Sequence, residues 1–173
     1  SMIFNEQPKS QPISKLQVQE AFKRVKANKG ASGVDGVTIE AVTKNTRKYL
    51  YPMWNRMASG SYYPKAVRQV LIPKGDGKMR PLGIPTIVDR VAQQVIATEL
   101  EQIVEEHFHP SSFGYQPNKS AHDAIEQCRI NSMKYSWVID LDIKGFFDNI
   151  DHDLLLKAVQ FYTQEKHILM YVK

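Results

Sequence analysis

The sequence predicts an α/β protein that is mainly helical. Helix-like spacing of apolar residues, opened by capping residues, recurs through most of the chain. β-prone residues concentrate in two places, a hairpin at about residues 67–84 and a short run at residues 137–139. A chain of 173 residues is long enough to bury one core, or one core and part of another.

Residues 1–13 are polar with two prolines, and we expect them to form a flexible arm. The first helix begins after the arm, because Ser14 and Gln17 form a capping-box pattern. Gly30 ends this helix, and a turn-rich loop runs on to residue 36. The glycines of that loop permit close approach of a backbone, although the loop could be only a connection.

Two further helices are expected before the hairpin. Thr38 is placed to cap the first of them, which would run to about residue 50. Pro52 can open the second, which would stop near Gly60.

The hairpin itself has mostly β-branched or apolar residues at 67–72, a turn at 74–78 and a return strand at 80–84. Pro81 confines the return strand to an edge or to irregular pairing.

Three helices are expected beyond the hairpin. Thr86 and Asp89 start a long one that ends before Pro110. Ser120 starts another that runs toward residue 133. The last covers about residues 152–161.

Charge divides the chain into a basic front and an acidic rear. Residues 1–90 carry 16 Lys and Arg against 6 Asp and Glu, whereas residues 91–173 carry 7 against 12. Between residues 44 and 80 there are nine basic residues and only Asp76 opposes them. This imbalance predicts a polyphosphate partner, with a solvated surface as the alternative. We define the basic block as these nine residues: Lys44, Arg47, Lys48, Arg56, Lys65, Arg68, Lys74, Lys78 and Arg80.

Composition excludes several classes of protein. No apolar stretch approaches the roughly 18 residues of a membrane span. Cys128 is the single cysteine, which excludes an internal disulfide and a cysteine-rich zinc site. A reducing bacterial cytoplasm is the expected location.

The acidic run at residues 137–152, WVIDLDIKGFFDNIDH, is the most informative segment. An apolar, β-prone stretch delivers carboxylates into a turn, and two aromatic residues follow. Buried carboxylates are costly without a cation, which predicts a metal–phosphate site. The charges could instead be solvated or cap the next helix. A calcium-binding loop is rejected, because Lys144 stands where a ligand oxygen is needed.

This run resembles the first catalytic motif of group II intron (maturase) reverse transcriptases. Three other segments resemble that family in the right order: residues 28–38 (NKGASGVDGVT), 78–85 (KMRPLGIP) and 112–125 (SFGYQPNKSAHDAI). The resemblance implies the fingers and the beginning of the palm of a right-hand polymerase. It divides the chain into an N-terminal extension at 14–36, fingers at 37–110 and the start of the palm at 111–173.

The resemblance also implies roles for individual residues. Asp142 corresponds to the first catalytic aspartate, which holds two Mg²⁺ ions together with the main-chain carbonyl of Ile143. Phe147 corresponds to the gate that excludes a ribose 2′-hydroxyl. Lys74 and Arg80, with Arg68 as a weaker candidate, would meet the nucleotide triphosphate.

The expected partners follow from the same resemblance. They are intron or template RNA, primer DNA and deoxynucleotides, with no membrane. The candidates for RNA binding are Lys29, Lys44, Arg47, Lys48, Arg56 and Lys65.

The family's second catalytic motif, an aromatic-Ala-Asp-Asp turn, does not occur in these residues. We therefore expect part of a longer enzyme, which holds Mg²⁺ weakly or not at all by itself and does not extend a primer. Two rivals remain open. One is a retron or diversity-generating reverse transcriptase. The other is a non-catalytic RNA-binding or maturase module, or one that associates with itself through exposed finger or palm surfaces.

Overall fold

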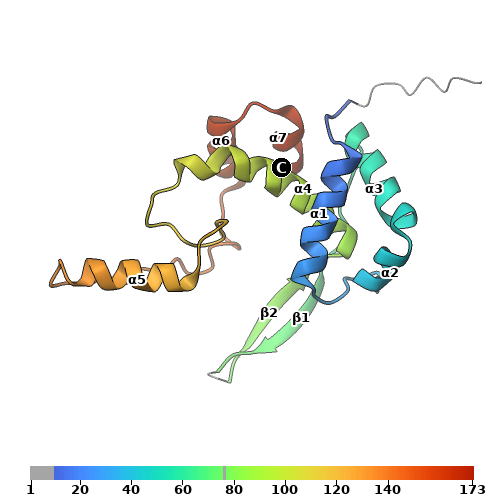
Figure 1. Ribbon diagram of the computed structural model, residues 1–173. Helices are drawn as coiled ribbons and strands as arrows, with labels where there is room; N and C mark the ends of the chain where they lie inside the picture. Colours follow the sequence, from blue (N-terminus) through green and yellow to red (C-terminus); the bar gives the residue numbers. More distant parts are fainter. Residues whose placement is uncertain (1–9, 76) are drawn as a thin grey trace, which may run out of the picture.

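The structure, a computed structural model, describes residues 10–75 and 77–173 (Figure 1). The expected flexible arm falls mostly on residues 1–9, which lie outside this part of the chain. In chain order the elements are α1 (Lys15–Asn28), α2 (Ile39–Lys44), α3 (Thr46–Ser59), β1 (Arg68–Pro73), β2 (Met79–Ile84), α4 (Ile87–Val104), a 3₁₀ turn (Glu105–His107), α5 (Ala121–Ser132), α6 (His152–Tyr162) and α7 (Lys166–Val172). The predicted class, mainly helical with a small sheet, is confirmed.

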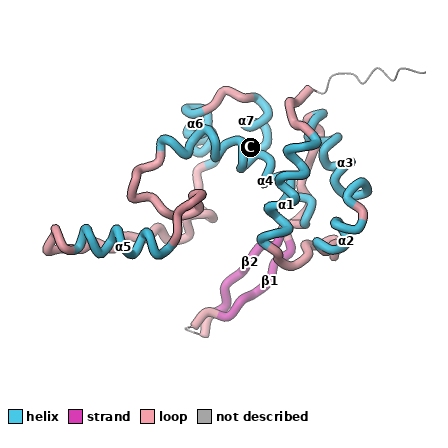
Figure 2. Tube along the Cα trace, viewed as in Figure 1, coloured by secondary structure: helices cyan, strands magenta, loops and turns pink. Residues whose placement is uncertain are grey.

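The core is built from α1, α2, α3, α4, α6 and α7, and the hairpin and α5 project away from it (Figures 1 and 2). Val42, Ala58, Ile87 and Val91 are completely buried there. α1 begins as predicted, with a complete capping box between Ser14 and Gln17. Its apolar face is buried, which fixes the N-terminal helix against the rest of the core.

The boundary between the second and third helices differs from the prediction. α2 ends at Lys44, and α3 already begins at Thr46. Asn45 makes the break, because its side chain accepts a hydrogen bond from the backbone N–H of Lys48, at 3.0 Å, and caps α3. Pro52 consequently lies inside α3 and does not open it.

The hairpin forms as predicted, as two antiparallel strands joined through residues 74–78. Lys74 N–H donates to the carbonyl of Lys78 at 2.6 Å. Hydrogen-bonded and non-hydrogen-bonded pairs alternate along an antiparallel ladder. Counted from the hydrogen-bonded pair Lys74 and Lys78, the third pair along the ladder is Leu71 with Pro81. This pair therefore stands at a non-hydrogen-bonded position. The ring of Pro81 therefore removes no hydrogen bond from the hairpin.

α4 begins at its predicted cap, Thr86, and lies along α1. α7 is an element that the sequence interpretation missed. It packs on the core through fully buried Ile168. His167 Nε2 lies 2.5 Å from Glu99 of α4, and the Tyr171 hydroxyl donates to the carbonyl of Met57 in α3 at 2.7 Å.

The expected buried strand at residues 137–139 is wrong for this structure. The segment has no regular structure, and Trp137, Val138 and Ile139 are all largely exposed. A strand needs a neighbour to satisfy its backbone groups, and no strand of the described residues pairs with this one. α6 follows as predicted, with Asp151 as its N-cap.

Candidate nucleotide and nucleic-acid interface

One face of the hairpin combines arginines with apolar side chains. Directly opposed residues of an antiparallel pair lie on the same face. Arg68 pairs with Ile84 and Arg80 with Ile72, so both guanidinium groups belong to the same face as Val70. Arg80 is exposed. The Nε of Arg68 is buried and has no hydrogen-bond partner among the described residues.

The glycine-rich loop is fixed against the base of the hairpin. Arg90 of α4 donates from Nε to the carbonyl of Pro85 at 3.2 Å and from Nη2 to the carbonyl of Ala31. A Cβ atom on Gly33 would lie 2.6 Å from the backbone nitrogen of Thr86. The close approach that glycine permits in this loop is therefore to the chain's own backbone. No motif or spacing in the sequence indicates this role of Arg90.

A buried carboxylate joins the irregular segment that leads into the hairpin to the start of α4. Asp89 is almost fully buried, and it accepts from the Thr86 hydroxyl at 2.6 Å, from the Tyr62 hydroxyl and from the backbone N–H of Lys65. Burial, and then the hydrogen bond to Asp89, raise the pKa of Tyr62 above its usual range. From the sequence, Asp89 was predicted only to start a helix, and this network was not predicted.

The acidic segment forms an exposed loop. Gly145 adopts a left-handed conformation, φ 62°, and its carbonyl accepts from the backbone N–H of Asp148 at 3.2 Å. Phe147 projects into solvent, 81% exposed, with its ring edge-on to that of Phe146 at 5.3 Å between centroids. Asp142 lies in the same loop and is exposed. The carboxylate of Asp142 and the ring of Phe147 are therefore both accessible to solvent.

The carboxylate of Asp142 and the main-chain carbonyl of Ile143 are the two metal ligands predicted for this loop. Within residues 10–75 and 77–173, no three His, Cys, Asp or Glu side chains approach closely enough to hold a metal ion. The described residues alone therefore do not complete the two-metal site that the resemblance implies.

Comparison with known proteins identifies the family. The family described as reverse transcriptase (RNA-dependent DNA polymerase) matches residues 72–173, which is more than half of the chain. The chain belongs to the reverse transcriptase family. This confirms the resemblance found in the sequence motifs.

The chain is similar to several known proteins, two of which carry the word intron in their names. Protein YkfC of Escherichia coli is 37% identical over 148 residues, 82% of this chain and 39% of the relative. Group II intron-encoded protein LtrA of Lactococcus lactis is 36% identical over 146 residues, 84% of this chain and 24% of the relative. The COX1/OXI3 intron 1 protein of Saccharomyces cerevisiae is 32% identical over 84% of this chain and 17% of its own length. The chain thus spans well under half the length of each.

The reverse transcriptase match covers only some of the predicted site residues. Lys74, Arg80, Asp142 and Phe147 lie inside residues 72–173. Arg68, on the hairpin face shared with Arg80, lies just outside it. The candidates for RNA binding also precede the matched span.

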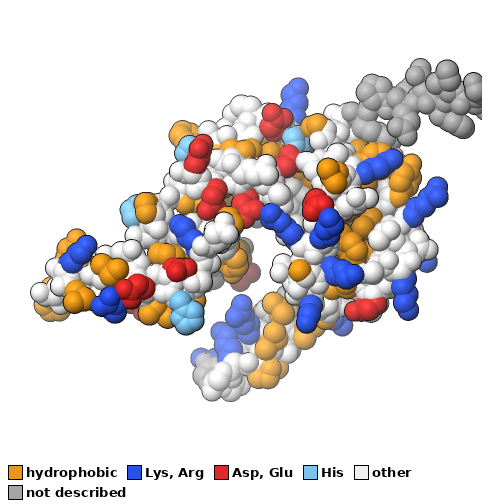
Figure 3. Space-filling view, in the orientation of Figure 1, with side chains coloured by type: hydrophobic (Ala, Val, Ile, Leu, Met, Phe, Trp, Pro, Cys, Tyr) orange, Lys and Arg blue, Asp and Glu red, His pale blue; other side chains and the backbone are white. Residues whose placement is uncertain are grey.

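Many of the basic residues lie on the side of the molecule formed by α1, α2 and α3. Figure 3 shows Lys and Arg side chains there, and others over the hairpin and α5. Lys44, Arg47, Lys48 and Arg56 are exposed on α2 and α3. Lys65 differs from them, because its Nζ is 3.1 Å from Asp35 and its charge is already paired. No helix of the described residues has the length and apolar character needed to cross a bilayer.

Proposed function

We propose that this chain forms the fingers and the beginning of the palm of a group II intron-type RNA-directed DNA polymerase. The observation that carries the proposal is the hairpin face with Arg68 and Arg80, adjoining the span that matches reverse transcriptases. The names of the intron-encoded relatives favour this type over a retron or diversity-generating enzyme. The proposed divisions are residues 14–36, 37–110 and 111–173.

The hairpin is proposed to receive the triphosphate of an incoming deoxynucleotide. A triphosphate carries several negative charges, and Arg80 can bind two phosphate oxygens through its planar guanidinium. Lys74 lies at the turn of the same hairpin, and Arg68 lies on the same face of the hairpin as Arg80. These donors would neutralise charge that develops on the leaving phosphates.

The carboxylate of Asp142 and the carbonyl of Ile143 are proposed to bind Mg²⁺ in the complete enzyme, where further carboxylates must complete the site. When bound, Mg²⁺ would activate the primer hydroxyl and offset the charge of the triphosphate. Phe147 would stand beside the sugar and exclude a 2′-hydroxyl by its bulk. Because the described residues do not complete this site, we expect no primer extension from them alone.

The nucleotide role can be tested by titrating the chain with dTTP and following backbone amide resonances by nuclear magnetic resonance. Amides of residues 68–84 should shift, and Arg80→Ala should weaken dTTP binding roughly tenfold or more, because it removes hydrogen bonds from a charged group. Arg80→Lys should bind more weakly than the wild type, since it cannot form the paired contact. Arg129→Ala, which removes an exposed arginine from α5, is the matched control. Equal effects of Arg80→Ala and Arg129→Ala would contradict this role.

The basic side of the molecule is proposed to bind intron or template RNA, with primer DNA joining it in the complete enzyme. The support is the cluster of exposed cations on α2 and α3, which have no neighbouring carboxylate in the sequence between residues 44 and 75. The site of action would be the bacterial cytoplasm, because two of the matched relatives come from bacteria.

Self-association is a second candidate function, favoured by the exposed apolar segment at residues 137–147. Trp137, Ile139 and Leu141 are each more than 80% exposed, and such a patch favours an interface between copies. Sedimentation at rising protein concentration tests it. A monomer throughout would remove this candidate.

A further inference from the structure

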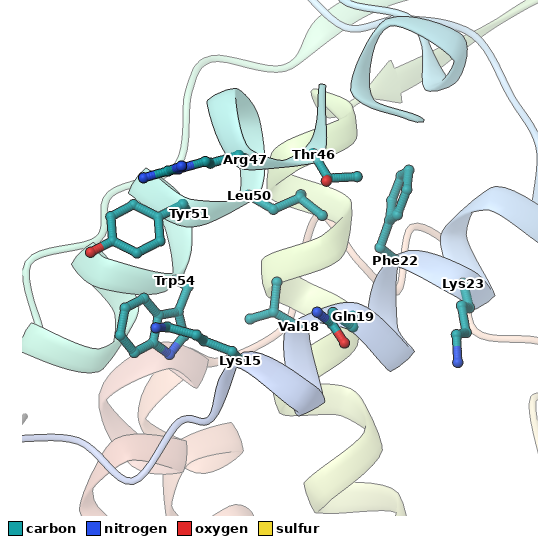
Figure 4. A pocket seen from close by; sticks show the side chains of 10 residues that line it. All are labelled: Lys15, Val18, Gln19, Phe22, Lys23, Thr46, Arg47, Leu50, Tyr51 and Trp54. Carbon is teal, nitrogen blue, oxygen red and sulfur yellow. The ribbon is translucent and has the colours of Figure 1, made fainter. Parts of the chain in front are cut away.

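α1 and α3 diverge on their outer side and leave a groove between them. Its volume is about 600 Å³. Figure 4 shows the side chains that line it, with α4 passing behind. Val18 and Phe22 of α1 and Leu50 and Trp54 of α3 form its apolar base, and all four are buried.

The rim of the groove is cationic. Lys15 and Lys23 of α1 and Arg47 of α3 line it, and no carboxylate does. Lys23 is partly neutralised, since its Nζ is 2.7 Å from Glu20. Arg47 is exposed and has no ion-pair partner among the described residues. The groove therefore favours an anionic ligand with an apolar, flat part.

One end of the groove is aromatic. The Nζ of Lys15 lies 4.5 Å from the ring centroid of Trp54 and 5.6 Å from that of Tyr51. Tyr51 is 49% exposed, so part of its ring remains available to a ligand. Gln19 and Thr46 add hydrogen-bonding groups from opposite walls. An apolar cavity with a few polar groups is the usual form of a site that selects a small ligand.

We propose that the groove between α1 and α3 takes an unpaired nucleotide of single-stranded RNA. The base would enter between the helices, against Leu50 and Tyr51, and the flanking phosphates would bind Lys15 and Arg47. Proteins commonly recognise single-stranded RNA in this way, with a base displaced from its neighbours and held by aromatic and polar side chains.

An acidic amphipathic helix is the other ligand that would fit an apolar groove with a basic rim. One observation favours RNA. Lys44 and Lys48 are exposed and lie within three residues of Arg47 in the sequence, so they add cations beside the rim, as a phosphate backbone requires.

This proposal rests on the proposed RNA-binding function, and it assigns a place to one nucleotide of the bound strand. Its test uses Trp54 as the reporter. Trp54 and Trp137 are the two tryptophans of the chain. Trp137 is 89% exposed, so Trp137→Phe leaves Trp54 as the only indole without disturbing the core.

The Trp137→Phe protein is titrated with an oligouridylate of about 12 nucleotides and with an abasic strand of equal length. Trp54 fluorescence and the anisotropy of a labelled strand are both measured. We expect oligouridylate to change Trp54 emission and the abasic strand to leave it unchanged. The abasic strand should bind roughly 5- to 150-fold more weakly, the loss expected for one stacked base.

A variant that fills the groove gives the second arm. Gln19→Phe places a ring at the exposed mouth without changing the core, and Gln160→Phe on α6 is the matched control. Gln19→Phe should abolish the Trp54 response and bring the affinity for oligouridylate down to that of the abasic strand. Gln160→Phe should change neither, and circular dichroism should show both variants folded.

The outcomes separate this inference from the function on which it rests. Absence of any RNA binding at low salt would overturn both. Binding of oligouridylate without a Trp54 response, or unchanged binding by Gln19→Phe, would overturn the groove and leave RNA binding intact. A Trp54 response to a synthetic acidic amphipathic peptide but not to oligouridylate would assign the groove to a protein partner, and would also overturn it.

Discussion

Tyr62 and Asp89 show how single residues hold the base of the hairpin. The Tyr62 hydroxyl donates to the buried carboxylate of Asp89, and burial and this bond raise the pKa of Tyr62. A raised pKa means that the folded state favours the protonated phenol. The resulting stability is fully present below the pKa of the unfolded tyrosine, about 10, and is lost progressively as the pH rises above it.

We therefore predict that the free energy of unfolding falls above about pH 10 by up to about 1.4 kcal/mol per pH unit through Tyr62. Tyr62→Phe should lose this contribution, and it should cost about 1–3 kcal/mol at neutral pH because Asp89 loses a donor. Urea unfolding at a series of pH values measures both effects. Tyr63→Phe, at an 85% exposed neighbour, is the control. If the free energy of unfolding fell equally steeply at alkaline pH in Tyr62→Phe and in the wild type, this role of Tyr62 would be contradicted.

Position 33 requires glycine because the backbone of Thr86 approaches it too closely for a side chain. A Cβ atom there would lie 2.6 Å from the backbone nitrogen and 2.7 Å from the Cα of Thr86, and neither backbone atom can move independently of α4. We predict that Gly33→Ala lowers the free energy of unfolding by about 1–3 kcal/mol. Gly114→Ala is the matched control, since nothing lies within 4 Å of its Cβ position, and it should be nearly neutral. Equal stability of the two variants in urea would show that the loop is not held against α4.

Among the elements, α5 differs from all the helices of the core. It has a complete capping box and an ion pair between Glu126 and Arg129 at 2.7 Å, but no buried side chain. A helix of 12 residues is marginal in water without tertiary packing. We predict that amide hydrogens of α5 exchange far faster than those of α4 in the same sample, measured by hydrogen–deuterium exchange. Similar protection in both helices would mean that α5 is packed against a surface in solution.

The elements that the sequence predicted well carry their signals locally. The caps at Ser14, Thr86 and Ser120, and the turn of the hairpin, are read from a few neighbouring residues. The break at Asn45 was missed, because Thr38 and Pro52 offered a competing pair of signals. α7 was also missed, since its place depends on contacts with Glu99 and Met57, which are distant in sequence.

Residues of the candidate site, like the elements, were predictable only where their signals are local in the sequence. Asp142, Phe147 and Arg80 could be proposed as site residues because they belong to motifs whose residues stand side by side in the sequence. Arg90 and the Asp89 network could not be found in this way, because their partners lie on other elements. The strand expected at residues 137–139 shows the converse case. Its β-prone side chains favour a strand, but pairing requires a second strand that the described residues do not contain.

For the whole molecule, the charge division predicted from the sequence is partly visible in space. Lys and Arg side chains cover α1, α2 and α3 in the view of Figure 3, whereas most Asp and Glu side chains in that view lie over the part formed by α4, α5 and α6. We propose that α2 and α3 bind RNA through its phosphates.

The most direct test is the dependence of RNA affinity on salt. If about five phosphates are neutralised, the logarithm of the binding constant for single-stranded RNA should fall with the logarithm of the salt concentration with a slope of roughly −3.5. The double variant Lys44→Ala, Lys48→Ala should reduce the steepness by about 1.4. The control pair Lys157→Ala, Lys166→Ala, from the acidic half, should not. An affinity that does not depend on salt, or no detectable RNA binding at about 50 mM salt, would contradict the proposal that α2 and α3 bind RNA through its phosphates.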